Sequence, residues 1–199
     1  MGANYQTGCC MPRTIKGFFF DLDGTLIDTE EANYQAYKQA INNVCGIKIT
    51  KLQYRQTHGM VYSKFLPILI PNISLEEIEK ISMKKKEIYR AQVHLTKPNI
   101  FLIEFLKRMA DDYITVLVTT AKKDNAKIVL EKHKITELFD YMVFGDDVNN
   151  MKPNPEAYNI ALKLCSLNEY EVIAFEDSSV GISAAHSAGI STIHIRSFL

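Results

Sequence analysis

A short apolar run that stops at two acidic residues constrains this chain most. Residues 17–20 read Gly-Phe-Phe-Phe and lead straight into Asp21-Leu22-Asp23. Such a run is typical of a buried parallel strand, which places the acids at its carboxyl end. Side chains two positions apart in extended backbone point the same way, so we expect Asp21 and Asp23 on one side. A lone pair of this kind is more often a turn or a helix cap, so the other strand ends decide its meaning.

Three further predicted strands also end on polar residues. They span residues 113–118, 141–144 and 172–175, with helical patterns between them and a last strand over 192–195. Strands that alternate with helices predict parallel βαβ units, whose carboxyl ends form one ligand-binding edge. The polar residues that follow these strands are Thr119 and Thr120, then Asp146, Asp147 and Lys152, then Glu176, Asp177, Ser178 and Ser179. Carboxylates, hydroxyls and one lysine therefore converge on one edge.

The segment between the first two of these strands predicts helices and no convincing strand. Residues 30–45 have helical spacing that ends at Gly46, and residues 60–70 are apolar at helical spacing. Capping boxes begin at Thr50 and at Ser74, and the second opens a long helix. The helical stretch therefore interrupts an α/β pattern directly after its first strand.

These patterns predict the division of the chain. We expect an α/β fold: a Rossmann-like parallel sheet core in residues 15–27 and 98–199, with an inserted α-helical cap domain at 28–97. Residues 1–14 are polar and predict a loose arm. Lysines 84–86 lie in the insert and are interpreted as a solvated helix face.

The residues at the strand ends indicate phosphoryl-transfer chemistry. Clustered carboxylates repel unless a cation lies between them, and all-oxygen ligands suit Mg²⁺. Lys152 offers a point charge for a phosphate, and Thr119 offers a hydrogen bond. Gly24 lets the backbone approach an anion closely. One carboxylate can then act as the nucleophile and a second can transfer a proton.

Charge and composition exclude other classes of protein. Lysine plus arginine number 23, as do aspartate plus glutamate, so the chain lacks the basic excess of a nucleic-acid binder. No apolar run reaches the roughly 18 residues that a membrane span needs. Four scattered cysteines predict no disulfide framework, and no secretory leader is visible. We therefore expect a cytoplasmic monomer with neither nucleic acid nor membrane as a partner.

The motifs together resemble a known family. Residues 20–26, Phe-Asp-Leu-Asp-Gly-Thr-Leu, resemble the first motif of the haloacid-dehalogenase-like superfamily, while Thr119, Lys152 and the pair Glu176-Asp177 match the second, third and fourth. The phrases FDLDGTLIDTE, KPNPEAY and FEDSSVGISAAHSAG are most similar to the branch of β-phosphoglucomutases and phosphoglycolate phosphatases, which carry a helical cap between the first two motifs. The resemblance covers roughly residues 15–195.

The resemblance implies catalytic and metal-binding roles. Asp21 would attack the phosphoryl group and form an aspartyl-phosphate. Asp23 would protonate the leaving oxygen and then activate water. Mg²⁺ would be held by the Asp21 side chain, the Asp23 backbone carbonyl and Asp177, with Glu176 contributing. Because dehalogenases and phosphonatases of the family lack the second aspartate, Asp23 favours phosphate esters.

The resemblance also assigns the phosphoryl group to Thr119 and Lys152, with Thr120 as the substitute if the strand ends one residue later. In the cap it points to a loop around a glycine, best matched by His58-Gly59, as the substrate-specificity element.

The mutases typically follow that glycine with an arginine that binds a second phosphate. Tyr62 holds the corresponding place here, with Arg55 and Lys64 as candidate substitutes. For His58 an exposed place near a helix end is an equally good interpretation.

The implied function is a Mg²⁺-dependent phosphatase of a small phosphorylated metabolite, of sugar-phosphate or phosphoglycolate type. A β-phosphoglucomutase-like mutase is the alternative, because it uses the same Asp21 chemistry but returns the phosphoryl group to sugar. A catalytically silent binding protein with this fold is a third hypothesis, and the complete set of motif residues counts against it.

Overall fold

A five-stranded parallel sheet forms the centre of the computed structural model, which describes residues 14–57 and 60–196. The strands are β1 (Gly17–Phe20), β4 (Ile114–Val118), β5 (Tyr141–Val143), β6 (Val172–Glu176) and β7 (Ser191–His194). Their order is β5-β4-β1-β6-β7, and every neighbouring pair is parallel. The Rossmann-like α/β fold predicted from the sequence is therefore confirmed, with β1 at its centre. The predicted arm falls almost entirely outside the described residues.

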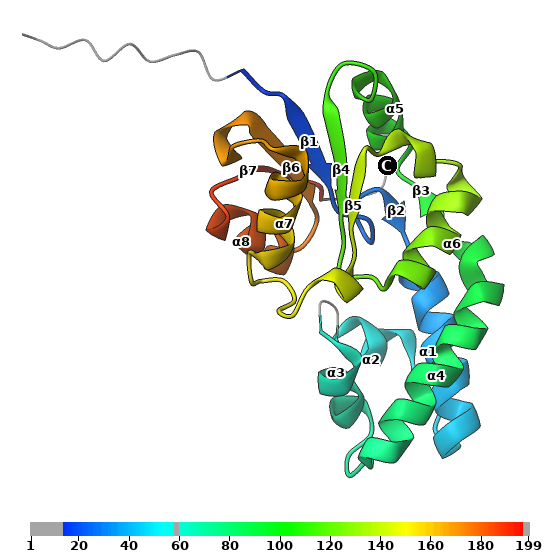
Figure 1. Cartoon of the computed structure of the whole chain (residues 1–199). Helices are drawn as coiled ribbons and strands as arrows, with labels where there is room; N and C mark the ends of the chain where they lie inside the picture. Colours follow the sequence, from blue (N-terminus) through cyan, green and yellow to red (C-terminus); the bar gives the residue numbers. More distant parts are fainter. Residues whose placement is uncertain (1–13, 58–59, 197–199) are drawn as a thin grey trace, which may run out of the picture.

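Helices cover both faces of the sheet (Figure 1). Helices α5 (Ile100–Met109) and α6 (Lys123–His133) lie on one face, and α7 (Glu156–Cys165) and α8 (Ser179–Ser187) lie on the other. Phe18 and Phe20 pack into the cluster of the first face, while Phe19 packs into the second. Both faces of β1 are thus buried, which explains why its sequence is apolar without alternation.

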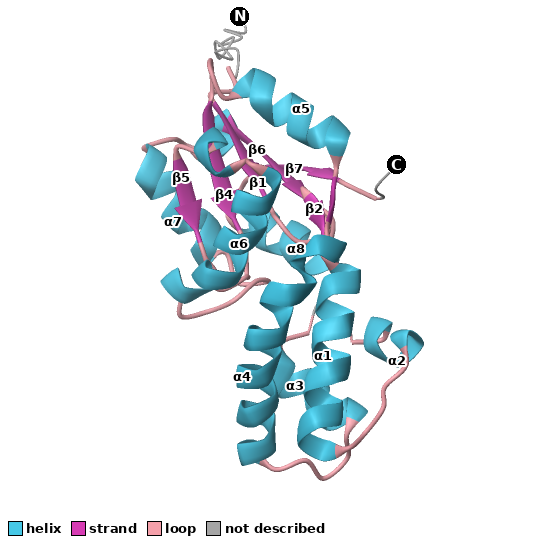
Figure 2. Cartoon of the chain, turned by 90° about the vertical axis from the view of Figure 1, so that its right-hand side faces the viewer, coloured by secondary structure: helices cyan, strands magenta, loops and turns pink. Residues whose placement is uncertain are grey.

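The insert contributes four helices, which lie beyond the carboxyl ends of the strands of the sheet (Figure 2). They are α1 (Glu30–Cys45), α2 (Lys51–Arg55), α3 (Tyr62–Leu69) and α4 (Leu75–Gln92). Both predicted capping boxes are present, at Thr50 and Ser74, and Gly46 ends α1 with φ of 69°. Short 3-10 turns lie at Val93–Leu95, Thr136–Leu138, Gly145–Asp147 and Glu169–Glu171. No helix in the described part of the chain is long and apolar enough to cross a membrane.

Two very short strands join the insert to the sheet. Strand β2 (Ile27–Asp28) pairs antiparallel with β3 (Lys97–Pro98). The expectation of no strand within residues 28–97 was therefore wrong at its two ends, because a two-residue strand carries no periodic signal. Ala36 of α1 and Tyr89 of α4 belong to the same buried cluster as the sheet. The division into a core domain and an inserted cap domain at 28–97 stays a prediction.

Candidate active site

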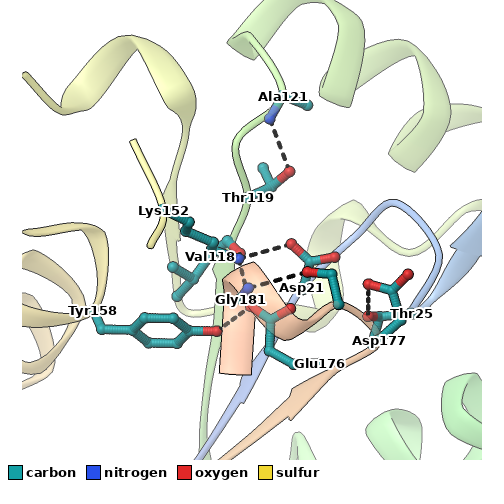
Figure 3. Close-up of polar contacts among 11 residues, drawn as sticks. Asp21, Thr25, Val118, Thr119, Ala121, Lys152, Tyr158, Glu176, Asp177 and Gly181 are labelled. Atoms are coloured by element: carbon teal, nitrogen blue, oxygen red, sulfur yellow. Dashed lines mark hydrogen bonds and ion pairs between the residues drawn. The ribbon is translucent and has the colours of Figure 1, made fainter. Parts of the chain in front are cut away.

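Lys152 lies at the centre of the site and joins residues from three distant parts of the sequence. Its Nζ donates to Asp21 Oδ1 at 2.8 Å, to Glu176 Oε1 at 2.6 Å and to the Val118 carbonyl at 2.9 Å (Figure 3). These groups come from the ends of β1, β6 and β4, which are neighbours in the sheet. The parallel topology therefore brings together the predicted motif residues.

Because these charged groups are buried together, each of them affects the pKa of the others. Asp21, Lys152 and Glu176 are all buried, and the Tyr158 hydroxyl donates to Glu176 Oε1. Burial disfavours the charge of Lys152, but the two carboxylates outweigh it and raise the pKa of the ammonium. Burial also raises the pKa of Glu176, helped by Asp21 and opposed by Lys152. One cation for two buried carboxylates leaves an excess of negative charge.

That excess fits a hard cation. Asp21, Glu176 and Asp177 each offer a carboxylate oxygen, and these oxygens lie within 4.8 Å of one another. Glu176 Oε2 is buried and has no hydrogen-bond partner among the described residues. A buried, unpartnered carboxylate oxygen beside two others is the oxygen environment that Mg²⁺ takes. The donor set therefore fits the metal expected from the sequence.

Two glycines give these carboxylates their space. A methyl group on Gly24 would overlap the Asp177 carboxylate, and one on Gly181 would overlap Glu176. Gly24 also has φ of 88°, which glycine adopts without strain. Gly181 lies in the first turn of α8, where its N–H donates to Ser178 Oγ at 3.0 Å and so caps the helix. Glycine at both positions lets the backbone approach the acids closely.

Asp23 has its own hydrogen-bonded support. It is half-buried, and its Oδ1 accepts from the Thr29 hydroxyl, which itself accepts from Asn33 Nδ2 at 3.2 Å. Burial raises the pKa of Asp23, and the Thr29 hydrogen bond opposes that rise. Asp23 does not belong to the group of three metal-binding carboxylates.

Thr29 and Asn33 were not predicted from the sequence. Thr29 precedes α1 like an ordinary helix cap, but its hydroxyl makes no capping hydrogen bond and turns to Asp23 instead. That preference is set by tertiary packing, so local sequence gives no signal of it.

The two threonines after β4 occupy different places. Thr119 is buried, and its hydroxyl oxygen accepts from the Ala121 N–H at 3.0 Å. Thr120 is exposed and lines the cavity beside Asp21. Asp146 and Asp147 follow a strand as expected, yet they accept hydrogen bonds from the backbone N–H groups of Lys123 and Phe144. These two acids stabilise loops and do not join the carboxylate group.

A cavity of about 1010 Å³ separates this edge of the sheet from the inserted helices. Tyr62 lines it, and its hydroxyl lies 3.4 Å from Glu79 Oε1. The other predicted specificity residues, His58 and Gly59, lie outside the described residues. Arg55 does not line the cavity and instead donates to Glu30 Oε1 at 2.8 Å. Lys64 does not line the cavity either.

Lys85 corrects the interpretation of lysines 84–86 as a solvated face. Lys84 pairs with Glu87 and Lys86 with Asp124 on the surface, at 2.8 and 2.7 Å. Lys85 turns inward to the cavity, with Nζ 4.2 Å from the centre of the Tyr89 ring. Burial lowers the pKa of Lys85 to about 8, and Asp23 opposes that fall. The only sequence signal of this inward orientation is the four-residue spacing from Lys85 to Tyr89, which places the two side chains on one helix face.

Known proteins are similar to this chain in sequence and in fold. The family model described as "Haloacid dehalogenase-like hydrolase" matches residues 18–195. A "Phosphorylated carbohydrates phosphatase" of Thermotoga maritima is 33% identical over 186 residues, which cover 90% of this chain and 84% of that protein.

Two solved structures share the fold and are also similar in sequence. CbbY from Rhodobacter sphaeroides in complex with phosphate has a TM-score of 0.79 at 26% identity, covering 93% of this chain and 88% of that one. A putative β-phosphoglucomutase from Thermotoga maritima has a TM-score of 0.69 at 31% identity, covering 92% and 88%.

Proposed function

The chain is a phosphoric monoester hydrolase that belongs to the haloacid dehalogenase-like family, and from that premise we propose that it hydrolyses small phosphorylated carbohydrates with the help of Mg²⁺. One observation carries this proposal: buried Asp21 is held by Lys152 beside two further metal-binding carboxylates, at the edge of a large cavity. Such a site combines a nucleophile with groups that neutralise phosphate charge.

The reaction divides into two steps. An Asp21 carboxylate oxygen attacks phosphorus, the bond to the leaving oxygen breaks, and Asp23 gives that oxygen a proton. Water then attacks the aspartyl-phosphate, Asp23 takes its proton, and inorganic phosphate leaves with Asp21 restored. The raised pKa of Asp23 suits a group that must hold a proton in the first step. Thr29 keeps one oxygen of Asp23 engaged, which leaves the other for proton transfer.

The remaining polar groups bind the phosphoryl group and the metal ion. Lys152 compensates the phosphoryl oxygens as well as Asp21, and Thr119 and Thr120 supply hydroxyl donors after β4. Asp21, Glu176 and Asp177, with the backbone carbonyl of Asp23, would hold Mg²⁺. When bound, the metal supplies positive charge that stabilises the transferring phosphoryl group.

A hexose-phosphate mutase is the second candidate, and the 31% identity to a putative β-phosphoglucomutase favours it. A mutase must bind a second phosphate during its cycle. Arg55, the cap arginine considered for that task, does not line the cavity and is paired with Glu30. That pairing favours transfer to water. Product analysis separates the two, because hydrolysis releases inorganic phosphate whereas the mutase converts β-glucose 1-phosphate to the 6-phosphate.

The test of the proposed function is turnover of p-nitrophenyl phosphate with and without Mg²⁺, in wild type and in Asp21→Asn. We expect Mg²⁺-dependent release of nitrophenol, reduced by about three orders of magnitude or more in the variant. Circular dichroism of both proteins controls for folding. Equal rates for wild type and variant across a broad phosphate panel would contradict the proposal and favour a silent binding protein.

A further inference from the structure

Four tyrosines of the insert line the helical wall of the cavity, and three of them have hydroxyls without a partner among the described residues. Tyr37 lies on α1, Tyr54 on α2 and Tyr89 on α4, and all three line the cavity. None of their hydroxyls bonds to another described residue, and none is among the described polar atoms sealed from solvent. Each hydroxyl therefore has hydrogen-bonding capacity that the fold leaves open to the cavity.

Tyr89 is unusual among the buried tyrosines. The other two described tyrosines that are buried, Tyr34 and Tyr158, give their hydroxyls to Ile49 O and Glu176 Oε1. Tyr89 is 2% exposed, yet its hydroxyl has no hydrogen-bond partner among the described residues. Buried polar groups are normally hydrogen-bonded, so an open hydroxyl in a cavity is available to a bound ligand.

The phenols stay neutral and lie within electrostatic reach of the proton-transfer group. Burial raises the pKa of Tyr54 and of Tyr89, and the Asp23 carboxylate contributes to both shifts. Burial also raises the pKa of Tyr37. Neutral phenols can both donate and accept, which matches an alcohol. The leaving oxygen that Asp23 protonates must lie between Asp23 and this wall.

Two lysines of the insert, Lys85 and Lys86, line the cavity. Lys86 pairs with Asp124 at 2.7 Å. Lys85 lies over the rings of Tyr37 and Tyr89, at 5.2 and 4.2 Å from their centres. The helical wall thus offers aromatic faces and neutral hydroxyls, with Lys85 as its one lysine outside the described ion pairs.

We propose that Tyr37, Tyr54 and Tyr89 are specificity residues that bind the hydroxyls of an uncharged, polyhydroxylated leaving group. The preferred substrate class is then a sugar or sugar-alcohol monophosphate, and bisphosphates are disfavoured. This proposal rests on the proposed function, since the leaving group must be joined to the phosphoryl that Asp21 receives. The apolar C–H faces of such a group pack on the rings while its hydroxyls bond to the phenols.

The test uses Tyr37→Phe, Tyr54→Phe and Tyr89→Phe, which remove only the hydroxyl. For each variant kcat/KM is measured with the best sugar monophosphate of a hexose and pentose panel, and with p-nitrophenyl phosphate, which has no alcohol hydroxyls. We expect the ratio of the two values to fall about three- to tenfold per variant, the effect of one neutral hydrogen bond. Tyr34→Phe, whose hydroxyl bonds to Ile49 O outside the cavity, is the matched control and should keep the ratio of wild type.

Each outcome decides between the two proposals. An unchanged ratio in all three variants overturns the assignment of the phenols, as does preferred turnover of fructose 1,6-bisphosphate over fructose 1-phosphate. Wild type that hydrolyses p-nitrophenyl phosphate but no sugar monophosphate also overturns it while leaving the phosphatase proposal intact. Failure to hydrolyse any phosphate ester removes the proposed function and this inference together.

Discussion

The two walls of the cavity hold their polar groups in different ways. On the sheet side, Lys152 makes three hydrogen bonds at 2.6 to 2.9 Å, and its partners are buried. On the helical side, the hydroxyls of Tyr37, Tyr54 and Tyr89 have no partner among the described residues. The ion pairs of Arg55 and Lys86 lie at the surface. Both walls are built from common residue types, so the difference between the walls comes from how their side chains are arranged.

This contrast shows which side chains of the cavity need a fixed geometry. Groups that react must keep one geometry, and buried ion pairs held by three neighbouring strands provide it. Groups that recognise a leaving group must stay open until it arrives, so the fold leaves their hydrogen bonds unmade. Replacing the reacting groups should therefore have larger consequences than replacing the recognising ones.

Removal of the Asp23 carboxyl should have the largest effect. Asp23→Asn cannot exchange protons with the leaving oxygen or with water, so we expect turnover to fall about 10²- to 10⁴-fold. The phosphoryl group should remain on Asp21, where mass spectrometry of the intact protein after substrate exposure detects it. Asp28→Asn, which changes an acid of the same cavity that bonds to the Glu30 N–H, is the control. Wild-type turnover in Asp23→Asn would contradict the assigned role.

The same substitution in each wall compares their stability directly. Lys152→Met leaves Asp21 and Glu176 buried without their cation, so we expect a loss of about 3–5 kcal/mol in the free energy of unfolding. Lys86→Met removes an exposed pair with Asp124 and should leave the free energy of unfolding close to that of wild type. Urea denaturation measures both values. Similar losses in the two variants would show that the buried ion pairs of Lys152 contribute no more to stability than the exposed pair.

A methyl group beside Glu176 should test whether this carboxylate binds the metal. Gly181→Ala would push its new carbon into the Glu176 carboxylate, so we expect the Mg²⁺ concentration for half-maximal activity to rise about tenfold. Ser183→Ala, an exposed site on the same helix, should leave that concentration unchanged. If both variants behave like wild type, Glu176 does not act at the metal.

The smallest expected effect concerns Lys85 and pH. Its pKa is about 8 in the folded protein against the ordinary 10.5, so between these values the unfolded chain holds a proton that the folded protein has lost. The stability of wild type relative to Lys85→Met should therefore be flat below about pH 8 and rise towards pH 10.5. Urea denaturation across this range measures the change. Lys84→Met, at an exposed pair with Glu87, should show no such slope.

Much of the fold could be predicted because its signals are local. The run of residues 17–20 indicated a central buried strand, and helical spacing gave residues 30–45, which are the bounds of α1. Parallel topology then required the carboxyl ends of β1, β5 and β6 to lie at one edge of the sheet, so Asp21, Lys152 and Glu176 could be placed together from the sequence alone.

The recognition side could not be predicted in the same way. Lys85 looked like one of three surface lysines, and Thr29 looked like a helix cap, because each has the local sequence of that ordinary role. Only packing of α1, α2 and α4 against one another decides which tyrosine hydroxyls find partners.

The sequence by itself therefore determined the chemistry, namely two aspartates, a lysine and an acidic pair at the ends of parallel strands. Tertiary structure alone decided how the cavity is closed and which hydroxyls stay unpaired within it. The physical reason is the range of the interactions: strand and helix signals lie within a few residues, whereas burial of Lys85, Tyr89 and Glu176 depends on side chains far away in the chain.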